Sequence, residues 1–444
     1  MAFISNAIEQ TMHSALADVL GDLVRGCPTP GFGLRLWDGS KWGTDDHPTF
    51  TLVLKHPRAL REMFIAPTQL SLGEAYIAGD FDVEGDMEAA YEFGEYLLAQ
   101  NKSITYSEKL RVASMLQGLS VHHRQNADHK GAEIHGLRHS KERDAEAIRY
   151  HYDLPPEFFA LWLDRKMVYS CAYFANGPDE TLDEAQEHKL DYICRKLRLR
   201  RGDRLLDLGC GWGGLLIYAA AHYGVLAHGI TLSVRQAEVA REKIRQAGLE
   251  ERCRVEVCDY RDMESDCKFD KIVSVGMFEH VGEALLPEYF RRASDLLCPG
   301  GVFLNHGISA AAGRPADGPS FIERYVFPDG ELVPLHRSMG AAERSGFEVR
   351  DVESLREHYA LTLYQWVHRL ESRADEARRI VGETAYRIWR LYMAGSEHQF
   401  RTGELNLYQM LLAKPLHGDS GLPLTRADWY RRGNEPNDRV NQQA

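Results

Sequence analysis

The chain has 444 residues, which is enough for two or three compact domains. Its 53 Lys and Arg residues are outnumbered by 65 Asp and Glu residues, and the formal net charge is −12. This balance argues against a nucleic-acid-binding protein, whose binding face normally carries a basic excess. No run approaches the roughly 20 apolar residues that a membrane-spanning helix needs, so any membrane association is expected to be peripheral.

The eight cysteines form no C-x-x-C pair, and residues 1–23 lack the basic start and apolar block of a secretory leader. We therefore expect reduced thiols in a cytoplasmic protein. Cys253, Cys258 and Cys267 are clustered, but their spacing fits no common zinc site, so no metal centre is predicted.

Residues 1–120 are predicted to form a small α+β domain. An apolar residue recurs at every fourth position from Ile4 to Leu20, which indicates an amphipathic helix. Two short aromatic strands joined by an Asp-Gly turn are predicted in residues 31–43, and a third strand in residues 49–56.

Three segments are predicted from their composition. Residues 121–144 are polar and rich in His, Lys and Arg, which indicates an interdomain linker. Residues 310–335 contain Gly and Pro and follow a predicted strand, as a lid would. Residues 416–444 form a polar tail that is expected to be poorly ordered.

Strand and helix patterns alternate over residues 145–415. Residues 204–208 and 225–232 are short apolar strands, and Ser233 is placed to cap a helix that ends at Gly248. Further strands are predicted at 253–259, 271–278 and 301–309. The alternation predicts an α/β fold with a doubly wound, mostly parallel sheet.

A glycine cluster follows the first of these strands, with glycines at 209, 211, 213 and 214. Such a loop lets a ligand approach the backbone at the start of a helix, and it suits a dinucleotide or S-adenosylmethionine. A dinucleotide site also needs an acidic residue about 20 positions later. No Asp or Glu occurs between Gly209 and Ala237, which favours a methyltransferase.

Six motifs occur in order across about residues 150–415. They are HYDLPPEFFALWLDRKMVYSCAYF, LLDLGCGWGG, GITLSVRQ, VSVGMFEHVG, NHGIS and FIERYVFPDGEL. Together they closely resemble the cyclopropane-fatty-acid synthase and mycolic-acid methyltransferase family. The resemblance implies a Rossmann-like class I methyltransferase domain. The amino-terminal α+β domain resembles the extra domain of cyclopropane-fatty-acyl-phospholipid synthases, which modify membrane phospholipids.

The resemblance implies that S-adenosylmethionine is the cofactor. Matching the family motifs to this chain assigns the following cofactor-binding residues: Tyr169, Ser170, Gly209, Cys210, Gly211, Thr231, Leu232, Ser233, Gln236, Tyr260 and Arg261.

The resemblance also implies a bound bicarbonate ion that accepts a proton. Its site is assigned to Cys171, Glu279, His306, Ile308 and Tyr359. His306 and Tyr359 can donate hydrogen bonds to the anion, Ile308 would act through its backbone, and Glu279 can accept from the acid hydroxyl. Candidates for stabilising a carbocation by cation–π contact are Tyr169, Tyr173, Phe174 and Phe278.

The implied reaction makes a cyclopropane across a cis double bond of an unsaturated phospholipid. An alternative on the same scaffold adds the carbon without ring closure and gives a methyl- or methylene-branched chain. Two other classes are a regulatory lipid-binding protein with an inactive cofactor site and a methyltransferase for soluble small molecules.

Association with the inner face of the membrane is expected, and the family suggests a homodimer. The predicted helix at residues 4–20 could dock on anionic head groups. Basic residues that could assist it are Arg195, Lys196, Arg198, Arg200 and Arg201.

Overall fold

The structure is a computed structural model that describes residues 31–43, 45, 47–56, 59, 68–101, 131–264, 269–313 and 320–430. The predicted helix at 4–20, the first part of the predicted linker and the last part of the predicted tail lie outside these ranges, as do Cys27 and Cys267.

The amino-terminal unit is a four-stranded sheet with two described helices. Its strands follow the order β2-β1-β3-β4, and only β1 and β3 run parallel. Its elements are β1 (Phe32–Arg35), β2 (Lys41–Gly43), β3 (Phe50–Leu54), α3 (Gln69–Ile77), β4 (Phe81–Gly85) and α4 (Met87–Asn101). The Ser40 amide donates to Asp38 Oδ1 at 2.9 Å and closes the turn between the first two strands. The predicted α+β domain is confirmed.

The second unit contains a seven-stranded sheet in the order β10-β11-β9-β8-β5-β6-β7. Its strands are β5 (Arg204–Leu208), β6 (Leu226–Thr231), β7 (Cys253–Val257), β8 (Phe269–Val275), β9 (Leu297–Ala310), β10 (Glu348–Ser354) and β11 (Leu405–Ala413). The strands from β9 to β7 are parallel, whereas β11 is antiparallel to both of its neighbours. This sheet confirms the predicted mostly parallel α/β fold.

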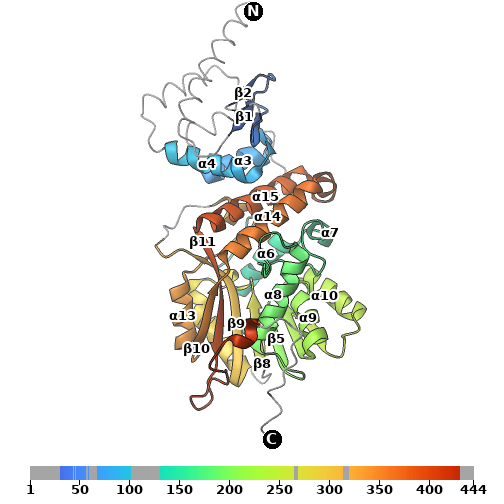
Figure 1. The fold of residues 1–444 in the computed structure, drawn as a ribbon, viewed down its shortest axis with the longest axis vertical. Coiled ribbons are helices and arrows are strands. Elements are labelled where there is room, and N and C mark those ends of the chain that lie inside the picture. The colour runs from blue at the N-terminus through green and yellow to red at the C-terminus, as the bar shows by residue number, and fades with distance from the viewer. Residues whose placement is uncertain are drawn as a thin grey trace, which may run out of the picture.

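Helices cover both faces of this sheet (Figure 1). Helices α8 (Leu182–Leu197), α9 (Gly214–Tyr223) and α10 (Val234–Gln246) share one apolar core with the sheet, and α11 (Leu286–Leu296) and α13 (Leu335–Arg344) share another on the opposite face. The covering face changes between β5 and β8. A crevice at such a switch point is the usual ligand site of an open α/β sheet.

Two long helices, α14 (Arg356–Ser372) and α15 (Ala374–Thr402), lie between the two units (Figure 1). Smaller helices complete the second unit: α6 (Lys141–Tyr152), α7 (Pro156–Phe159), α12 (Phe321–Tyr325), and the 3₁₀ turns η1 (Tyr260–Asp262), η2 (Phe278–His280), η3 (Glu283–Leu285) and η4 (Ala427–Tyr430). No described helix combines the length and apolar character that a bilayer crossing requires.

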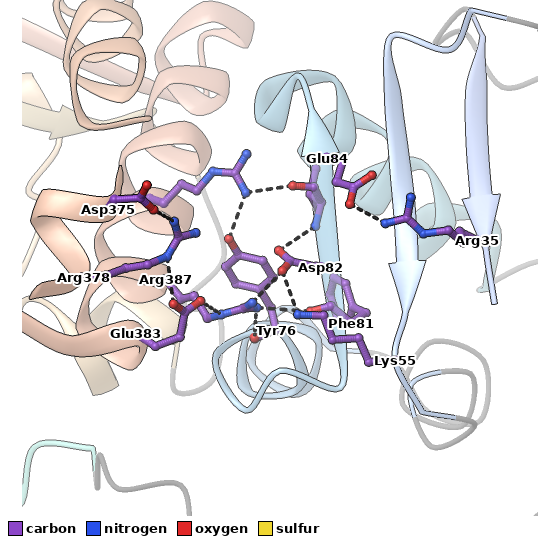
Figure 2. Close-up of polar contacts among 12 residues, drawn as sticks. Arg35, Lys55, Tyr76, Phe81, Asp82, Glu84, Asp375, Arg378, Glu383 and Arg387 are labelled. Atoms are coloured by element: carbon purple, nitrogen blue, oxygen red, sulfur yellow. Dashed lines mark hydrogen bonds and ion pairs between the residues drawn. The ribbon is translucent and has the colours of Figure 1, made fainter. Parts of the chain in front are cut away.

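Arg387 of α15 ties the two units together. Figure 2 shows its guanidinium between Glu383 of its own helix and Asp82 of β4. Arg387 Nη2 donates to Asp82 Oδ2 at 2.7 Å, and Nη1 donates to the carbonyl of Tyr76 at 3.0 Å. Lys55 reaches the same Asp82 oxygen from the other side at 3.0 Å. The amino-terminal sheet is therefore fixed to α15 by charge-assisted contacts around a buried arginine.

Several predicted boundaries differ from the structure. Helix α6 starts at Lys141, because the Ser140 hydroxyl accepts from the Arg143 amide, so the predicted boundary at residue 145 falls inside a helix. In the predicted tail, Trp429 is buried and its carbonyl accepts from the Arg195 side chain. The expectation of poor order is therefore wrong as far as residue 430. Most described residues of both segments are exposed or half-buried, and single residues such as Trp429 anchor them to the rest of the protein.

Candidate active site

A cavity of about 140 Å³ lies at the carboxyl ends of β5, β6 and β8, at the switch point of the sheet. The glycine loop after β5 forms one wall. Gly209 has a φ of +88°, and a Cβ at this position would lie 2.8 Å from the Cβ of Met277. Only glycine allows both this conformation and this approach. The loop leads directly into α9, whose first backbone amides are available to a ligand.

The predicted cofactor-binding residues gather around this cavity, with one exception. The residues that line it are Tyr169, Ser170, Gly209, Cys210, Gly211, Thr231, Leu232, Gln236, Tyr260 and Arg261. Ser233 does not line it. Its hydroxyl accepts from the backbone N–H of Gln236 and caps α10, as predicted. The cap orients Gln236, whose Oε1 accepts from the Thr231 hydroxyl at 2.7 Å.

Two charged residues that sequence reasoning did not assign also line the cavity. Asp207 is buried, its Oδ1 finds no hydrogen-bond partner among the described residues, and burial raises its pKa to about 7. Lys189 is buried, donates from Nζ to the Ser170 hydroxyl at 2.8 Å, and burial lowers its pKa to about 8. A carboxyl and an amine in the lining of one cavity are complementary to the ammonium and carboxylate of an amino acid. The cavity therefore suits the methionine end of S-adenosylmethionine.

Arg261 lines the cavity, but its guanidinium is already paired with two carboxylates. Its guanidinium donates to Asp259 and, at 2.8 Å, to Asp144 of α6. It also donates to the carbonyl of His139 at 3.0 Å. Arg261 therefore links the segment after β7 to the start of α6.

A much larger cavity of about 1420 Å³ adjoins the first. Residues common to both walls are Tyr152, Tyr169, Ser170, Gly276 and His280. All five residues predicted for the anion site line the larger cavity: Cys171, Glu279, His306, Ile308 and Tyr359. Apolar side chains of α3 and α4 line it too, so the amino-terminal unit contributes to its wall.

Glu279 and His306 each keep a buried atom without a partner among the described residues. The Ile308 amide donates to Glu279 Oε1 at 2.6 Å, which leaves Oε2 unpaired. Burial raises the pKa of Glu279 to about 7. His306 Nδ1 lies 3.0 Å from Gln409 Nε2, which leaves His306 Nε2 unpaired. Burial lowers the pKa of His306 well below its usual range, so this ring is neutral.

The other residues predicted for the anion site already have contacts within the protein. The Ile308 amide is already committed to Glu279, so it orients that carboxyl instead of being free for an anion. The Cys171 thiol donates to the carbonyl of Ala172 at 3.1 Å, and burial raises its pKa, so it stays protonated. Tyr359 packs its ring against Phe400, with 4.6 Å between centroids.

Of the four predicted carbocation-stabilising aromatics, Tyr169 lines both of these cavities, and the other three line neither. Tyr173 and Phe174 stack on His358, and Phe278 packs against core aromatics. Tyr392 of α15 was not predicted. Its hydroxyl lies 3.4 Å from that of Tyr169, although the two residues are 223 positions apart. No local pattern marks such a distant residue as part of the site.

The prediction that Lys196 belongs to a basic membrane-docking surface is wrong, because Lys196 is buried and forms an ion pair with Glu353. Arg195 and Arg198 are engaged by the carboxyl-terminal segment through Trp429 and Asp428. Arg200 and Arg201 remain exposed.

Comparisons with known proteins agree with this arrangement. A family model described as mycolic acid cyclopropane synthetase matches residues 139–410, and a model described as a domain of unknown function matches residues 23–108. The chain is 42% identical over 403 residues to a Pseudomonas putida protein named "Probable fatty acid methyltransferase", covering 90% of this chain and 96% of that one.

Two further similarities concern named cyclopropane synthases. The chain is 33% identical over 357 residues to the cyclopropane-fatty-acyl-phospholipid synthase of Escherichia coli (strain K12), covering 80% of this chain and 86% of that one. The crystal structure of the mycolic acid cyclopropane synthase CmaA1, complexed with SAH and CTAB, matches with a TM-score of 0.57 at 34% identity, covering 60% of this chain and 97% of that chain.

Proposed function

Because the chain belongs to the mycolic acid cyclopropane synthetase family of S-adenosylmethionine-dependent lipid-modifying enzymes, we propose that it converts a cis double bond in an unsaturated phospholipid acyl chain into a cyclopropane. The observation that carries the proposal is the shared wall of the two cavities, which brings a cofactor site beside a large, mainly apolar chamber. A long acyl chain is the kind of substrate that such a chamber suits.

The cofactor site can position S-adenosylmethionine, which when bound supplies an electrophilic methyl group on its sulfonium. Lys189 and Asp207 would hold the amino-acid end by charge. Thr231 and Gln236 line the same cavity and would contact the ribose, and Tyr260 would contact the adenine.

Ring closure requires a proton to leave the alkylated acyl chain. Glu279 Oε2 and His306 Nε2 have no partner within the described part of the chain, and both residues line the large cavity together with Tyr359. We propose that these groups hold bicarbonate, which supplies the base. Glu279 would accept from the acid hydroxyl, while His306 and Tyr359 would donate to the remaining oxygens.

The chamber also has to keep water from a carbocation. Tyr169 stands at the shared wall, with the rings of Trp162 and Trp366 at 5.4 and 5.2 Å from its own. Aromatic faces near a desolvated cation stabilise it by about 0.5–2 kcal/mol each. Aromatic rings at this wall would both help to exclude water and lower the energy of the cation.

The amino-terminal unit is proposed to lengthen the acyl site. Leu70 and Leu72 of α3 and Phe93 and Leu97 of α4 line the large cavity on the side away from the cofactor. A chain that enters between the units could place its double bond next to Tyr169 while its remainder stays among these apolar side chains. Peripheral docking on a membrane would let a phospholipid deliver that chain.

A second candidate is alkylation without ring closure, which gives a methyl- or methylene-branched acyl chain. It is favoured by the 42% identity with the fatty acid methyltransferase named above. Both reactions pass through the same alkylated carbocation, and loss of a proton from the new methyl group closes the ring. A hydride shift before that loss gives a methylene branch, whereas loss of a proton from a chain carbon gives a methyl-branched alkene. All of these outcomes are compatible with one cofactor site.

The deciding experiment incubates the purified full chain with S-adenosylmethionine and vesicles of a cis-monounsaturated phospholipid. Proton NMR of the acyl products is needed, because a cyclopropane and a methylene-branched alkene have the same mass. Upfield cyclopropyl protons are expected, whereas vinylidene protons would support the branched product. No transfer to lipid despite cofactor binding would overturn both candidates. Co-sedimentation with the same vesicles, with and without anionic lipid, tests peripheral docking.

A further inference from the structure

We propose that Gln409, with its amide held by Lys196, fixes His306 in the tautomer that carries its proton on Nε2. His306 then presents a hydrogen-bond donor, rather than a lone pair, beside the large cavity. Gln409 and Lys196 would be positioning residues for the anion site. The use of this donor rests on the proposed function, but the tautomer itself does not.

The orientation of the Gln409 amide follows from Lys196. Lys196 Nζ lies 2.8 Å from Gln409 Oε1, and an ammonium group can only donate, so the amide oxygen must face it. The amide nitrogen of Gln409 therefore faces His306 Nδ1, at 3.0 Å. That nitrogen can only donate, so Nδ1 must accept. In a neutral imidazole the proton is then on Nε2.

Strand pairing places the two side chains together. His306 of β9 is directly opposite Gln409 of β11 in the antiparallel register, so both point to the same face of the sheet. Helix α8 covers this face. Lys189 and Lys196 are seven residues apart, about two helical turns, and therefore lie on the same side of α8. Lys189 reaches Ser170 at the cofactor cavity, and Lys196 reaches the pair behind the anion site.

Lys196 is itself held from several directions. It is 1% exposed, forms an ion pair with Glu353, and lies 3.9 Å from Asp351 Oδ2. Its ammonium lies 5.5 Å from the centroid of the Trp429 ring, which closes the outer side. Burial lowers the pKa of Lys196, whereas the ion pair with Glu353 and the nearby Asp351 carboxylate favour its charged form. The ammonium group donates to Gln409 Oε1 and so sets one orientation of the Gln409 amide.

The tautomer of His306 matters at the predicted anion site because it decides whether Nε2 carries a proton. His306 Nε2 has no hydrogen-bond partner among the described residues, although the ring lines the large cavity. A proton at this nitrogen suits the oxygen of an anion, whereas a lone pair would repel it. Buried polar groups normally have hydrogen-bond partners, and an anion would supply the one that Nε2 lacks.

The test is NMR of the full chain produced with ring-¹⁵N histidine. Long-range ¹H–¹⁵N correlations distinguish the two neutral tautomers, and the signals lost in His306→Gln identify His306 among the 19 histidines. The wild-type protein is expected to show a neutral ring protonated on Nε2. A ring protonated on Nδ1, or on both nitrogens, would overturn the proposal without any further variant.

Gln409→Glu tests the control over the tautomer. A carboxylate can accept from Lys196 and from His306 Nδ1–H, so the proton should move to Nδ1. Turnover should then fall about tenfold or more, because a hydrogen bond to an anion is lost, while affinity for S-adenosylmethionine changes by less than about twofold. Gln365→Glu is the matched control. Its amide joins α14 to the backbone of Leu182 and Glu180, away from both cavities.

The outcomes separate this inference from the proposed function. An Nε2 proton in a protein that modifies no lipid would keep the tautomer assignment and refute the function. Lipid modification by a protein with the proton on Nδ1 would do the reverse. If Gln409→Glu changed neither the His306 signals nor turnover, Gln409 would not be a positioning residue.

Discussion

Replacing Glu279 by glutamine should slow the reaction and stabilise the protein at alkaline pH. The Glu279 carboxyl is buried, accepts one hydrogen bond from the Ile308 amide, and has a pKa raised by burial from 4.5 to about 7. Glutamine has nearly the same shape but never ionises. The variant therefore isolates the cost of burying this negative charge.

The size of the stability effect follows from the shift in the pKa of Glu279. The native protein retains the Glu279 proton between pH 4.5 and about 7, where the unfolded chain has lost it. The resulting stability is present at low pH and is lost as the pH rises through about 7. A shift of this size corresponds to about 3 kcal/mol in the free energy of unfolding. Most of it should disappear between about pH 5 and about pH 8.

Urea unfolding of the wild type and Glu279→Gln across this pH range measures the effect. The difference in the free energy of unfolding should move by about 2–3 kcal/mol in favour of the variant as the pH rises. Parallel pH profiles would refute the reasoning. Turnover should fall roughly ten- to a hundredfold through loss of an acceptor for the anion, with cofactor affinity unchanged. Glu180→Gln is the control, because Glu180 is similarly buried but lines neither cavity.

Three further substitutions test the rest of the structure. Gly209→Ala should weaken S-adenosylmethionine binding at least about tenfold in calorimetry, because a side chain at this positive φ meets Met277; unchanged affinity would contradict the position of the cofactor site. Asp207→Asn should lower the same affinity by about tenfold, since an amide cannot form an ion pair with an ammonium group; an equally tight complex would exclude that contact. Arg387→Met should lower the free energy of unfolding by about 2–3 kcal/mol, because the buried contacts to Asp82 and the Tyr76 carbonyl are lost; an unchanged urea midpoint would show that these contacts add no net stability.

The features that could be predicted are those encoded in short segments. The apolar runs correctly predicted the parallel strands, and the glycine loop follows the first of them as expected. The Ser233 hydroxyl caps α10, as predicted. These depend on residues within a few positions of each other. The resemblance extended the prediction to residues such as Glu279 and His306, which the fold brings to one cavity.

The features that were missed depend on contacts between distant segments. Lys196 looks like a surface cation because basic residues surround it in the sequence, yet Gln409, 213 positions later, accepts from it inside the protein. Tyr392 reaches Tyr169 from a helix that no motif connects with the site. The polar tail was misjudged at Trp429 for the same reason: charge in a sequence does not reveal whether its partner is water or protein.

The contacts of α15 with both units have a consequence for folding. One apolar cluster of described residues runs from Phe50 and Tyr76 in the amino-terminal unit to Trp162 and Trp389 in the second unit. Cutting the chain between the units would expose part of this cluster to water. Calorimetry should therefore record a single cooperative melting transition, and the methyltransferase unit expressed alone should be aggregation-prone. We therefore expect the two segments that look separable in the sequence to unfold together.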